Sequence, residues 1–313
     1  MSRFTSLFLL VCMASPAFGD AAKCRLIKDD AERLQCYDSA GVEGLTPSDQ
    51  FANLSISGQW DVLQSRKLYK MTPYEPIYLL PIAYTSSPNE TPFPDLNEGE
   101  FTNTEVKFQV STRLKISNNL LHRNVDLWFG YTQKTFWQLY NKHLSAMFRE
   151  TDYKPEVFFS LATDFKILNL DNRFIDFGIT HESNGREDPL SRSWNRLFTR
   201  FGLVKDELAV VVTPWWRIPE PDSRDDNPHI EDYVGRGEVR VVWKTANYAF
   251  STALRNNLDS SDNRGSVEIS WVFPISGSLN GVFQYFSGYG ESLVDYNQRM
   301  QRYSLGIVLI DWI

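Results

Sequence analysis

Apolar side chains recur at every second position through most of the chain after residue 74. In one such run, Val106, Phe108 and Val110 alternate with polar neighbours. A period of two is typical of β-strands, because successive side chains of a strand point to opposite faces. The pattern predicts twelve strands, at residues 75–85, 104–116, 124–137, 154–166, 173–183, 194–203, 207–217, 234–244, 248–255, 264–274, 279–286 and 301–312.

The connections between these strands alternate in length. Those after odd-numbered strands are mostly long, such as 86–103 and 218–233, and those after even-numbered strands are mostly short, such as 204–206 and 245–247. Membrane barrels have short periplasmic turns and longer outer loops. We therefore predict an all-β fold, a twelve-stranded antiparallel transmembrane β-barrel of the outer membrane, over residues 74–313.

The two registers of each strand face different surroundings. In lipid, the apolar register must point outward and the polar register into the lumen. The charged residues that fall inside carry both signs; they are Lys107, Arg113, Glu156, Asp164, Asp176, Arg196, Arg200, Glu238 and Arg240. Because the lumen of twelve strands is narrow, we expect these charges to pair and fill it. An open pore is the alternative.

The first 19 residues have the features of a secretory signal peptide. A basic start precedes an apolar run over residues 4–14, and small residues end at Gly19. We expect cleavage after Gly19 and an N-terminal periplasmic extension over residues 20–73. Cys24 and Cys36, the two cysteines of the mature chain, are expected to form a disulfide, with two free thiols as the alternative.

Composition narrows the class of function. Charged residues make up 23% of the chain, and no stretch of 18 or more apolar residues appears in its body, which argues against transmembrane helices. The net charge of −7 argues against a nucleic-acid partner. Aromatic residues make up 14% of the chain, an excess that favours the interfacial girdles of a membrane barrel.

Three polar residues fall in the outward register at one rim of the predicted barrel. His181 and Ser183 continue the apolar register of strand 173–183, and Asn195 is in phase with that of strand 194–203. The signal peptide leaves the extension in the periplasm, so this rim is at the cell surface. Polar side chains at a rim can simply face water, which is the alternative to a functional role.

These residue types can form a hydrolytic site. His181 would take the proton of Ser183 and later give it to the leaving group. Asn195 would accept the other imidazole N–H and fix the orientation of the ring. Backbone N–H groups of Ser183 and Gly185 could form part of an oxyanion hole. Asn stabilises the imidazolium less than Asp does, so another group should supply positive potential near the oxyanion. A cation there would strengthen the hole.

Several longer motifs surround these residues. They lie at 131–134, 137–139, 148–151, 181–186, 188–189, 191–196, 225–228 and 287–293. Together they resemble the signature of the bacterial outer membrane phospholipase A family, over about residues 74–313. The resemblance implies hydrolysis of acyl esters of phospholipids and lysophospholipids, calcium dependence and activation by dimerisation. It makes Ser183 the nucleophile, His181 the base and Asn195 the orienting residue.

The resemblance also implies a calcium site and a dimer contact. The carbonyl of Arg186 and the side chain of Ser191 from one subunit would bind calcium together with Ser145 from the other, and Asp226 matches an acidic position tied to calcium. Oxygen ligands of this kind suit calcium. Gln133 lies in the outward register, and the resemblance implies a hydrogen bond across the dimer interface. A rim Gln in water is the alternative.

The sequence therefore predicts a calcium-dependent phospholipase A1/A2 of the bacterial outer membrane. It would act as a homodimer, with its active site at the cell-surface rim. The alternative is a non-enzymatic barrel, such as a narrow pore, an adhesin or a structural protein.

Overall fold

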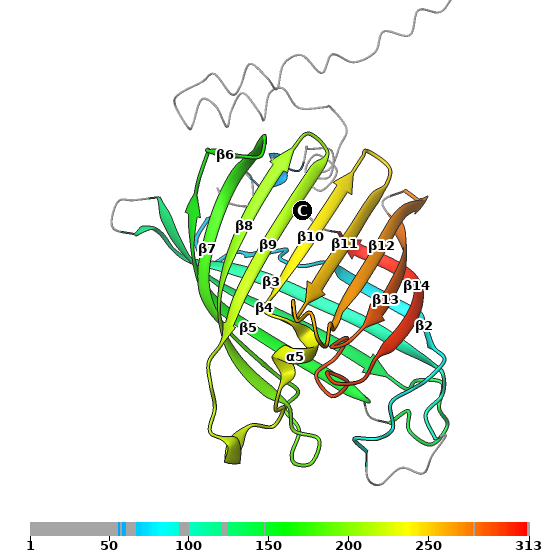
Figure 1. The fold of residues 1–313 in the computed structure, drawn as a ribbon. Coiled ribbons are helices and arrows are strands. Elements are labelled where there is room, and N and C mark those ends of the chain that lie inside the picture. Colours follow the sequence, from blue (N-terminus) through cyan, green and yellow to red (C-terminus); the bar gives the residue numbers. More distant parts are fainter. Residues whose placement is uncertain are drawn as a thin grey trace, which may run out of the picture. The chain divides into compact units, whose positions relative to one another are not determined.

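Twelve long antiparallel strands close into a barrel in the computed structural model (Figure 1). Each strand pairs with its neighbours in chain order, and β14 pairs with β2 to close the barrel. The strands are β2 (Ile77–Thr85), β3 (Thr104–Leu120), β4 (Val125–Trp137), β5 (Glu150–Ala162), β7 (Leu170–Ser183), β8 (Ser193–Lys205), β9 (Leu208–Arg217), β10 (Gly237–Lys244), β11 (Ala249–Asn256), β12 (Gly265–Ser276), β13 (Leu279–Gly288) and β14 (Met300–Ile310). The predicted fold class is confirmed.

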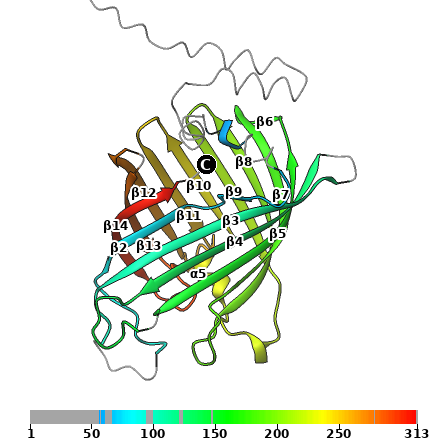
Figure 2. The same ribbon diagram turned by 180° about the vertical axis from the view of Figure 1, so that it is seen from behind.

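Within the described residues, several short elements lie outside these strands. They are β1 (Met71–Thr72), β6 (Lys166–Ile167), the 3-10 helix η1 (Asp222–Arg224) and the helix α5 (Ile230–Val234). The long loops and α5 gather at one end of the barrel and the short turns at the other, as Figure 1 and the reverse view in Figure 2 both show. We call the first of these ends the loop end.

The structure describes residues 56, 58–60, 67–93, 100–120, 124–146, 148–277 and 279–311. The signal peptide predicted at 1–19 and the disulfide predicted between Cys24 and Cys36 lie outside the described residues and stay predictions. No helix within the described ranges is long and apolar enough to cross a membrane.

Part of the predicted N-terminal extension contacts the barrel. β1 pairs with β3, and Ile56 and Trp60 are buried in an apolar cluster with residues of β8, β9 and β10. The ring of Trp60 meets that of Phe174 edge-on, with 5.1 Å between centroids. These described residues and the barrel belong to one compact unit. The boundary predicted at residue 74 stays a prediction.

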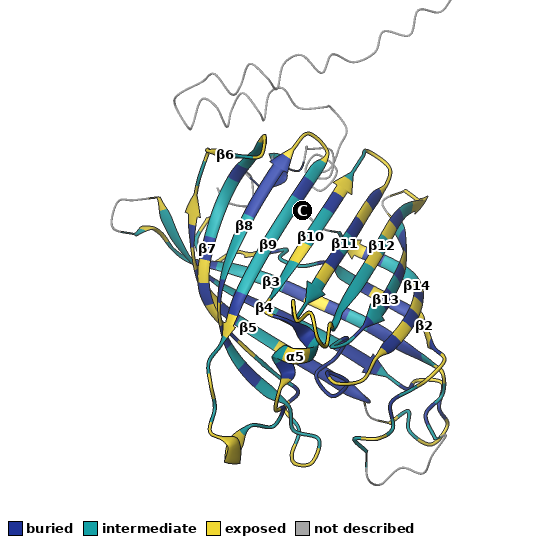
Figure 3. Ribbon diagram, in the orientation of Figure 1, coloured by how far each residue is buried: buried dark blue, intermediate teal, exposed yellow. Residues whose placement is uncertain are grey.

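Side chains alternate between the lumen and the outside along the strands. In β5, Val157 and Phe159 are exposed, whereas Glu156 and Phe158 are buried. Phe158 breaks the polar pattern of the inward register because it belongs to an aromatic cluster inside the barrel. There it stacks on Tyr74, with 5.8 Å between ring centroids. Figure 3 shows the buried and exposed bands that follow one another along the strands.

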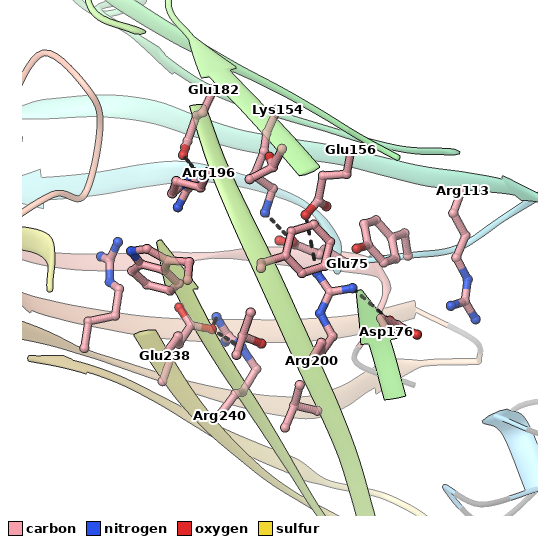
Figure 4. A pocket seen from close by; sticks show the side chains of 18 of the residues that line it. Glu75, Arg113, Lys154, Glu156, Asp176, Glu182, Arg196, Arg200, Glu238 and Arg240 are labelled. Atoms are coloured by element: carbon pink, nitrogen blue, oxygen red, sulfur yellow. Dashed lines mark hydrogen bonds and ion pairs between the residues drawn. The ribbon is translucent and has the colours of Figure 1, made fainter. Parts of the chain in front are cut away.

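Charged residues of both signs pair with one another inside the lumen (Figure 4). Arg200 contacts Asp176 at 3.2 Å and Glu156 at 3.4 Å, and Arg240 contacts Glu238 at 2.9 Å. A cavity of about 230 Å³ remains between these groups. The pairing agrees with the predicted filled interior, since two charges removed from water are stable there only when each has a partner.

Near β5 the prediction was wrong at the start of the strand and just beyond its end. The strand starts at Glu150 rather than at residue 154, because its first residues are polar and also buried, so they show no alternation. Asp164 was expected in the lumen. It lies exposed in a turn instead, because β5 ends at Ala162.

The loop between β13 and β14 is held at the loop end by buried ion pairs. Glu291 contacts Arg302 at 2.8 Å and Lys107 at 3.0 Å, and none of the three side chains is more than 1% exposed. Burial raises the pKa of Glu291, but the positive charges of Arg302 and Lys107 outweigh burial and lower the pKa to about 2. The carboxylate is therefore ionised in the folded protein at neutral pH.

Replacing Glu291 with Gln should lower the free energy of unfolding by about 3 kcal/mol, because two buried cations lose a charged partner. Urea unfolding in detergent micelles at neutral pH measures this change. Glu207, an exposed residue of the β8–β9 turn, provides the matched control. Its change to Gln should alter stability by less than about 0.5 kcal/mol. Equal stability of the two variants would contradict the role given to the ion pairs.

The same carboxylate should make stability depend on pH. The pKa of Glu291 is about 2 in the folded state, below the value of about 4.3 for an unfolded Glu. Its contribution to folding is therefore fully present above about pH 4.3 and is lost as the pH falls towards 2. The Glu291→Gln variant should lose less stability over this interval than the unchanged protein.

Candidate active site

His181 and Ser183 lie on the outward face of β7, at the loop end of the barrel. Thr180 and Glu182, which alternate with them along the strand, line the lumen cavity. Because side chains alternate along a strand, His181 and Ser183 point to the opposite side, away from the lumen. Ile179, the preceding residue in this outward register, is exposed. The side chains therefore face the surroundings of the barrel.

Asn195 of β8 stands directly opposite His181, and Nδ1 of His181 is 2.9 Å from Oδ1 of Asn195. The orientation of this amide follows from its other contact, because Nδ2 of Asn195 donates to the Glu220 carboxylate at 2.9 Å. An amide oxygen only accepts, so Nδ1 of His181 carries the proton. Nε2 is then free to accept a proton, as a general base must.

Ser183 ends β7 and is half-buried. It is paired in register with Tyr153 of β5 and Ser193 of β8, and it shares the outward face with His181. Among the hydrogen bonds between described residues, none joins Ser183 to His181. Hydrogen bonds between a nucleophile and its base commonly tighten only when substrate is bound. In this structure the two residues are neighbours because they share the outward face of β7.

Asn184 organises the loop that follows β7, a role that was not predicted from the sequence. Its buried side chain donates to Glu150 at 3.1 Å and to the carbonyl of Leu190 at 2.7 Å. Its Oδ1 accepts hydrogen bonds from the backbone N–H groups of Arg186 and Arg192. One amide thus fixes both ends of the loop. The position of Asn184 within the motif at 181–186 is the sequence feature that could have pointed to this role.

Gly185 is exposed and has a φ of +64°, a left-handed conformation that favours glycine. A Cβ added there would lie 3.4 Å from the ring of Tyr153. Glycine therefore lets the chain turn sharply just beyond Ser183. The backbone N–H groups of Ser183 and Gly185, predicted for an oxyanion hole, belong to this turn, and their role stays a prediction.

Two of the predicted calcium ligands are in contact. Ser191 Oγ donates to Asp226 Oδ2 at 2.5 Å, which joins the loop after β7 to the loop after β9. The guanidinium of Arg186 donates to the carbonyls of Phe148 and Arg149, both at 2.7 Å. No three His, Cys, Asp or Glu side chains gather as a metal-binding group among the residues that the structure describes.

The residues predicted to act between subunits lie on β4 and in the loop after it. The carbonyl of Ser145, which is half-buried, accepts a hydrogen bond from the indole of Trp137 at 2.9 Å. Gln133 accepts from the Tyr131 hydroxyl at 3.0 Å and donates to Thr135 at 3.2 Å. The contacts of Gln133 lie within β4, and that of Ser145 joins the following loop to β4. The intersubunit roles of Ser145 and Gln133 stay predictions.

A family comparison covers nearly all of the barrel. The family model described as phospholipase A1 matches residues 57–309. The chain belongs to the phospholipase A1 family. A phospholipase A1 of Klebsiella pneumoniae is 37% identical over 244 residues, which cover 78% of this chain and 83% of the relative. The family resemblance predicted from the motifs is therefore confirmed.

Solved structures show the same fold. Outer membrane phospholipase A from Escherichia coli superposes with a TM-score of 0.75 and 34% identity, covering 83% of this chain and 100% of that one. The Salmonella typhi outer membrane phospholipase dimer with bound calcium gives a TM-score of 0.74 and 35% identity, covering 83% and 98%. The chain is an enzyme of this family and a β-barrel of the bacterial outer membrane.

Proposed function

We propose that this chain is a calcium-dependent phospholipase that hydrolyses acyl esters of phospholipids and lysophospholipids through Ser183, His181 and Asn195. The contact of 2.9 Å between His181 and Asn195, on the same outer wall as Ser183, carries the proposal. The outer wall of a membrane barrel contacts lipid. A serine, a base and an orienting group placed there meet their substrate in the membrane itself.

The reaction proceeds in two halves. Ser183 Oγ attacks the acyl carbonyl carbon while its proton passes to Nε2 of His181. His181 then gives this proton to the departing alcohol oxygen as the ester C–O bond breaks, which leaves an acyl group on Ser183. A water molecule attacks this acyl carbon and gives a proton to His181. The fatty acid leaves as Ser183 takes that proton back.

Asn195 and the chain around Ser183 prepare the site for these steps. Asn195 Oδ1 accepts a hydrogen bond from the Nδ1–H of His181, so the ring keeps Nε2 towards Ser183. The backbone N–H groups of Ser183 and Gly185 donate to the oxygen that becomes negative in each tetrahedral intermediate. The left-handed conformation of Gly185 supports this role, because it turns the chain immediately after the nucleophile.

Calcium fits the residues at the rim. Ser191, Asp226 and the carbonyl of Arg186 would bind it, with Ser145 contributed by a second copy of the chain and Gln133 at the contact between the copies. When bound, calcium supplies positive charge near the oxyanion. The 2.5 Å contact between Ser191 and Asp226 supports the site, since it brings two oxygen ligands of the kind calcium prefers together.

The direct test compares catalysis with conduction in one preparation. Purified protein in mixed micelles of phospholipid and detergent with calcium should release fatty acid, measured by titration. The same protein in a planar bilayer should show no step conductance, because paired charges fill the lumen. Conductance without any lipid hydrolysis would contradict the proposal and favour the non-enzymatic barrel.

A further inference from the structure

Glu220 contacts the catalytic constellation from the loop that follows β9. Its carboxylate accepts a hydrogen bond of 2.9 Å from Nδ2 of Asn195. Two residues earlier, the N–H of Ile218 donates to the backbone carbonyl of Asn195 at 2.8 Å. The same short segment of the loop therefore forms hydrogen bonds with both the backbone and the side chain of Asn195.

The base of this loop is anchored at several points. Arg217, the last residue of β9, contacts Asp225 at 2.6 Å. The side chain of Asn227 is fully buried and accepts a hydrogen bond of 2.9 Å from the N–H of Ser193. These contacts tie both halves of the loop to the barrel, so the position of Glu220 beside Asn195 is set by the fold.

The carboxylate of Glu220 contacts the side-chain amide of Asn195. Within the described part of the chain, no Lys, Arg or His side chain forms an ion pair with Glu220, and the residue is half-buried. A carboxylate that accepts a charge-assisted hydrogen bond polarises the amide that donates it, which makes the amide oxygen a stronger acceptor. In this chain that oxygen accepts from His181.

We infer that Glu220 is a positioning residue that acts through Asn195, in a chain of hydrogen bonds that joins His181, Asn195 and Glu220 beside Ser183. This inference rests on the proposed function. A neutral Asn stabilises the imidazolium of His181 less than an Asp would. Glu220 restores a negative charge one hydrogen bond further away and holds the amide in the orientation that the ring requires.

The test is the Glu220→Gln variant, which keeps the size and one acceptor oxygen but removes the charge. With calcium saturating, kcat for phospholipid should fall about tenfold with KM unchanged, because the lost interaction acts in the transition state. The rate at which a long-chain sulfonyl fluoride labels Ser183 should fall by a similar factor. Asp222→Asn removes an exposed carboxylate of the same loop, and both rates should stay as in the unchanged protein.

The Asn195→Ala background tests whether Glu220 acts through Asn195. There, Glu220→Gln should change kcat less than twofold, since the connecting amide is already absent. A full additional tenfold loss in this background would overturn the inference. So would a Glu220→Gln variant that matches the unchanged protein, or one that alters only the calcium concentration for half-maximal activity.

The outcomes keep the two proposals apart. If the unchanged protein hydrolyses lipid and Ser183→Ala does not, the proposed function stands whatever Glu220→Gln does. If the Ser183→Ala variant remains as active as the unchanged protein, the proposed function itself fails, and the inference about Glu220 fails with it.

Discussion

Phospholipid hydrolysis should fall about a thousandfold or more when Ser183 is replaced with Ala. In the proposed mechanism Ser183 alone forms the acyl-enzyme bond, and removal of a serine nucleophile from a Ser–His site costs factors of this size. Fatty acid release from mixed micelles with calcium measures the loss. The variant should fold normally, because Ser183 is a half-buried rim residue and Ala fits the same strand position.

Ser193→Ala is the matched control for this experiment. Ser193 is also half-buried and is paired in register with Ser183 on the adjacent strand. Its variant should retain activity within about twofold, in keeping with the small effects of most surface substitutions. Both variants should show the heat-modifiable migration of a folded barrel on gels. Equal activity of the two variants would rule out Ser183 as the nucleophile.

Removal of calcium should lower activity about a hundredfold, the size of effect that one oxyanion-stabilising group has. Activity measured against buffered free calcium, with a chelator at the low end, tests this. Asp226→Asn should raise the calcium concentration for half-maximal activity about tenfold, because the site loses a negative oxygen ligand. Chemical crosslinking across the same titration should show dimers increasing with calcium.

Asp206→Asn supplies the comparison for the calcium titration. Asp206 is an exposed carboxylate in the β8–β9 turn, at the end of the barrel opposite the site. Its variant should follow the calcium curve of the unchanged protein. A protein that keeps full activity as a monomer in excess chelator would refute both the calcium site and the role of the second copy.

The strands of this barrel were predictable because lipid imposes a simple alternation. Strand β7 was expected at 173–183 and spans Leu170–Ser183, with the apolar register outward. The start of β5 was not predictable, because Glu150, Thr151 and Asp152 are polar and all buried. Where both faces of a strand contact protein rather than lipid, as at the loop end, the alternation disappears.

The same contrast applies to the site. His181 and Asn195 could be placed opposite each other because they lie on adjacent strands whose register follows from the alternation. The contact between Asn195 and Glu220 spans 25 residues and depends on how an irregular loop folds back. The bonds of Asn184 to its loop are of the same kind. Loop sequences have no hydrophobic periodicity, so contacts of this kind can be identified only in the folded structure.

In the proposed mechanism, the outward placement of His181 and Ser183 determines the kind of encounter that precedes catalysis. Substrate reaches these residues by lateral diffusion within the membrane and need not enter the protein. The relevant concentration is therefore the mole fraction of phospholipid in the surrounding layer, not the amount of lipid per volume of solution. Diluting the suspension should leave turnover unchanged, whereas mixing an inert amphiphile into the layer should slow it.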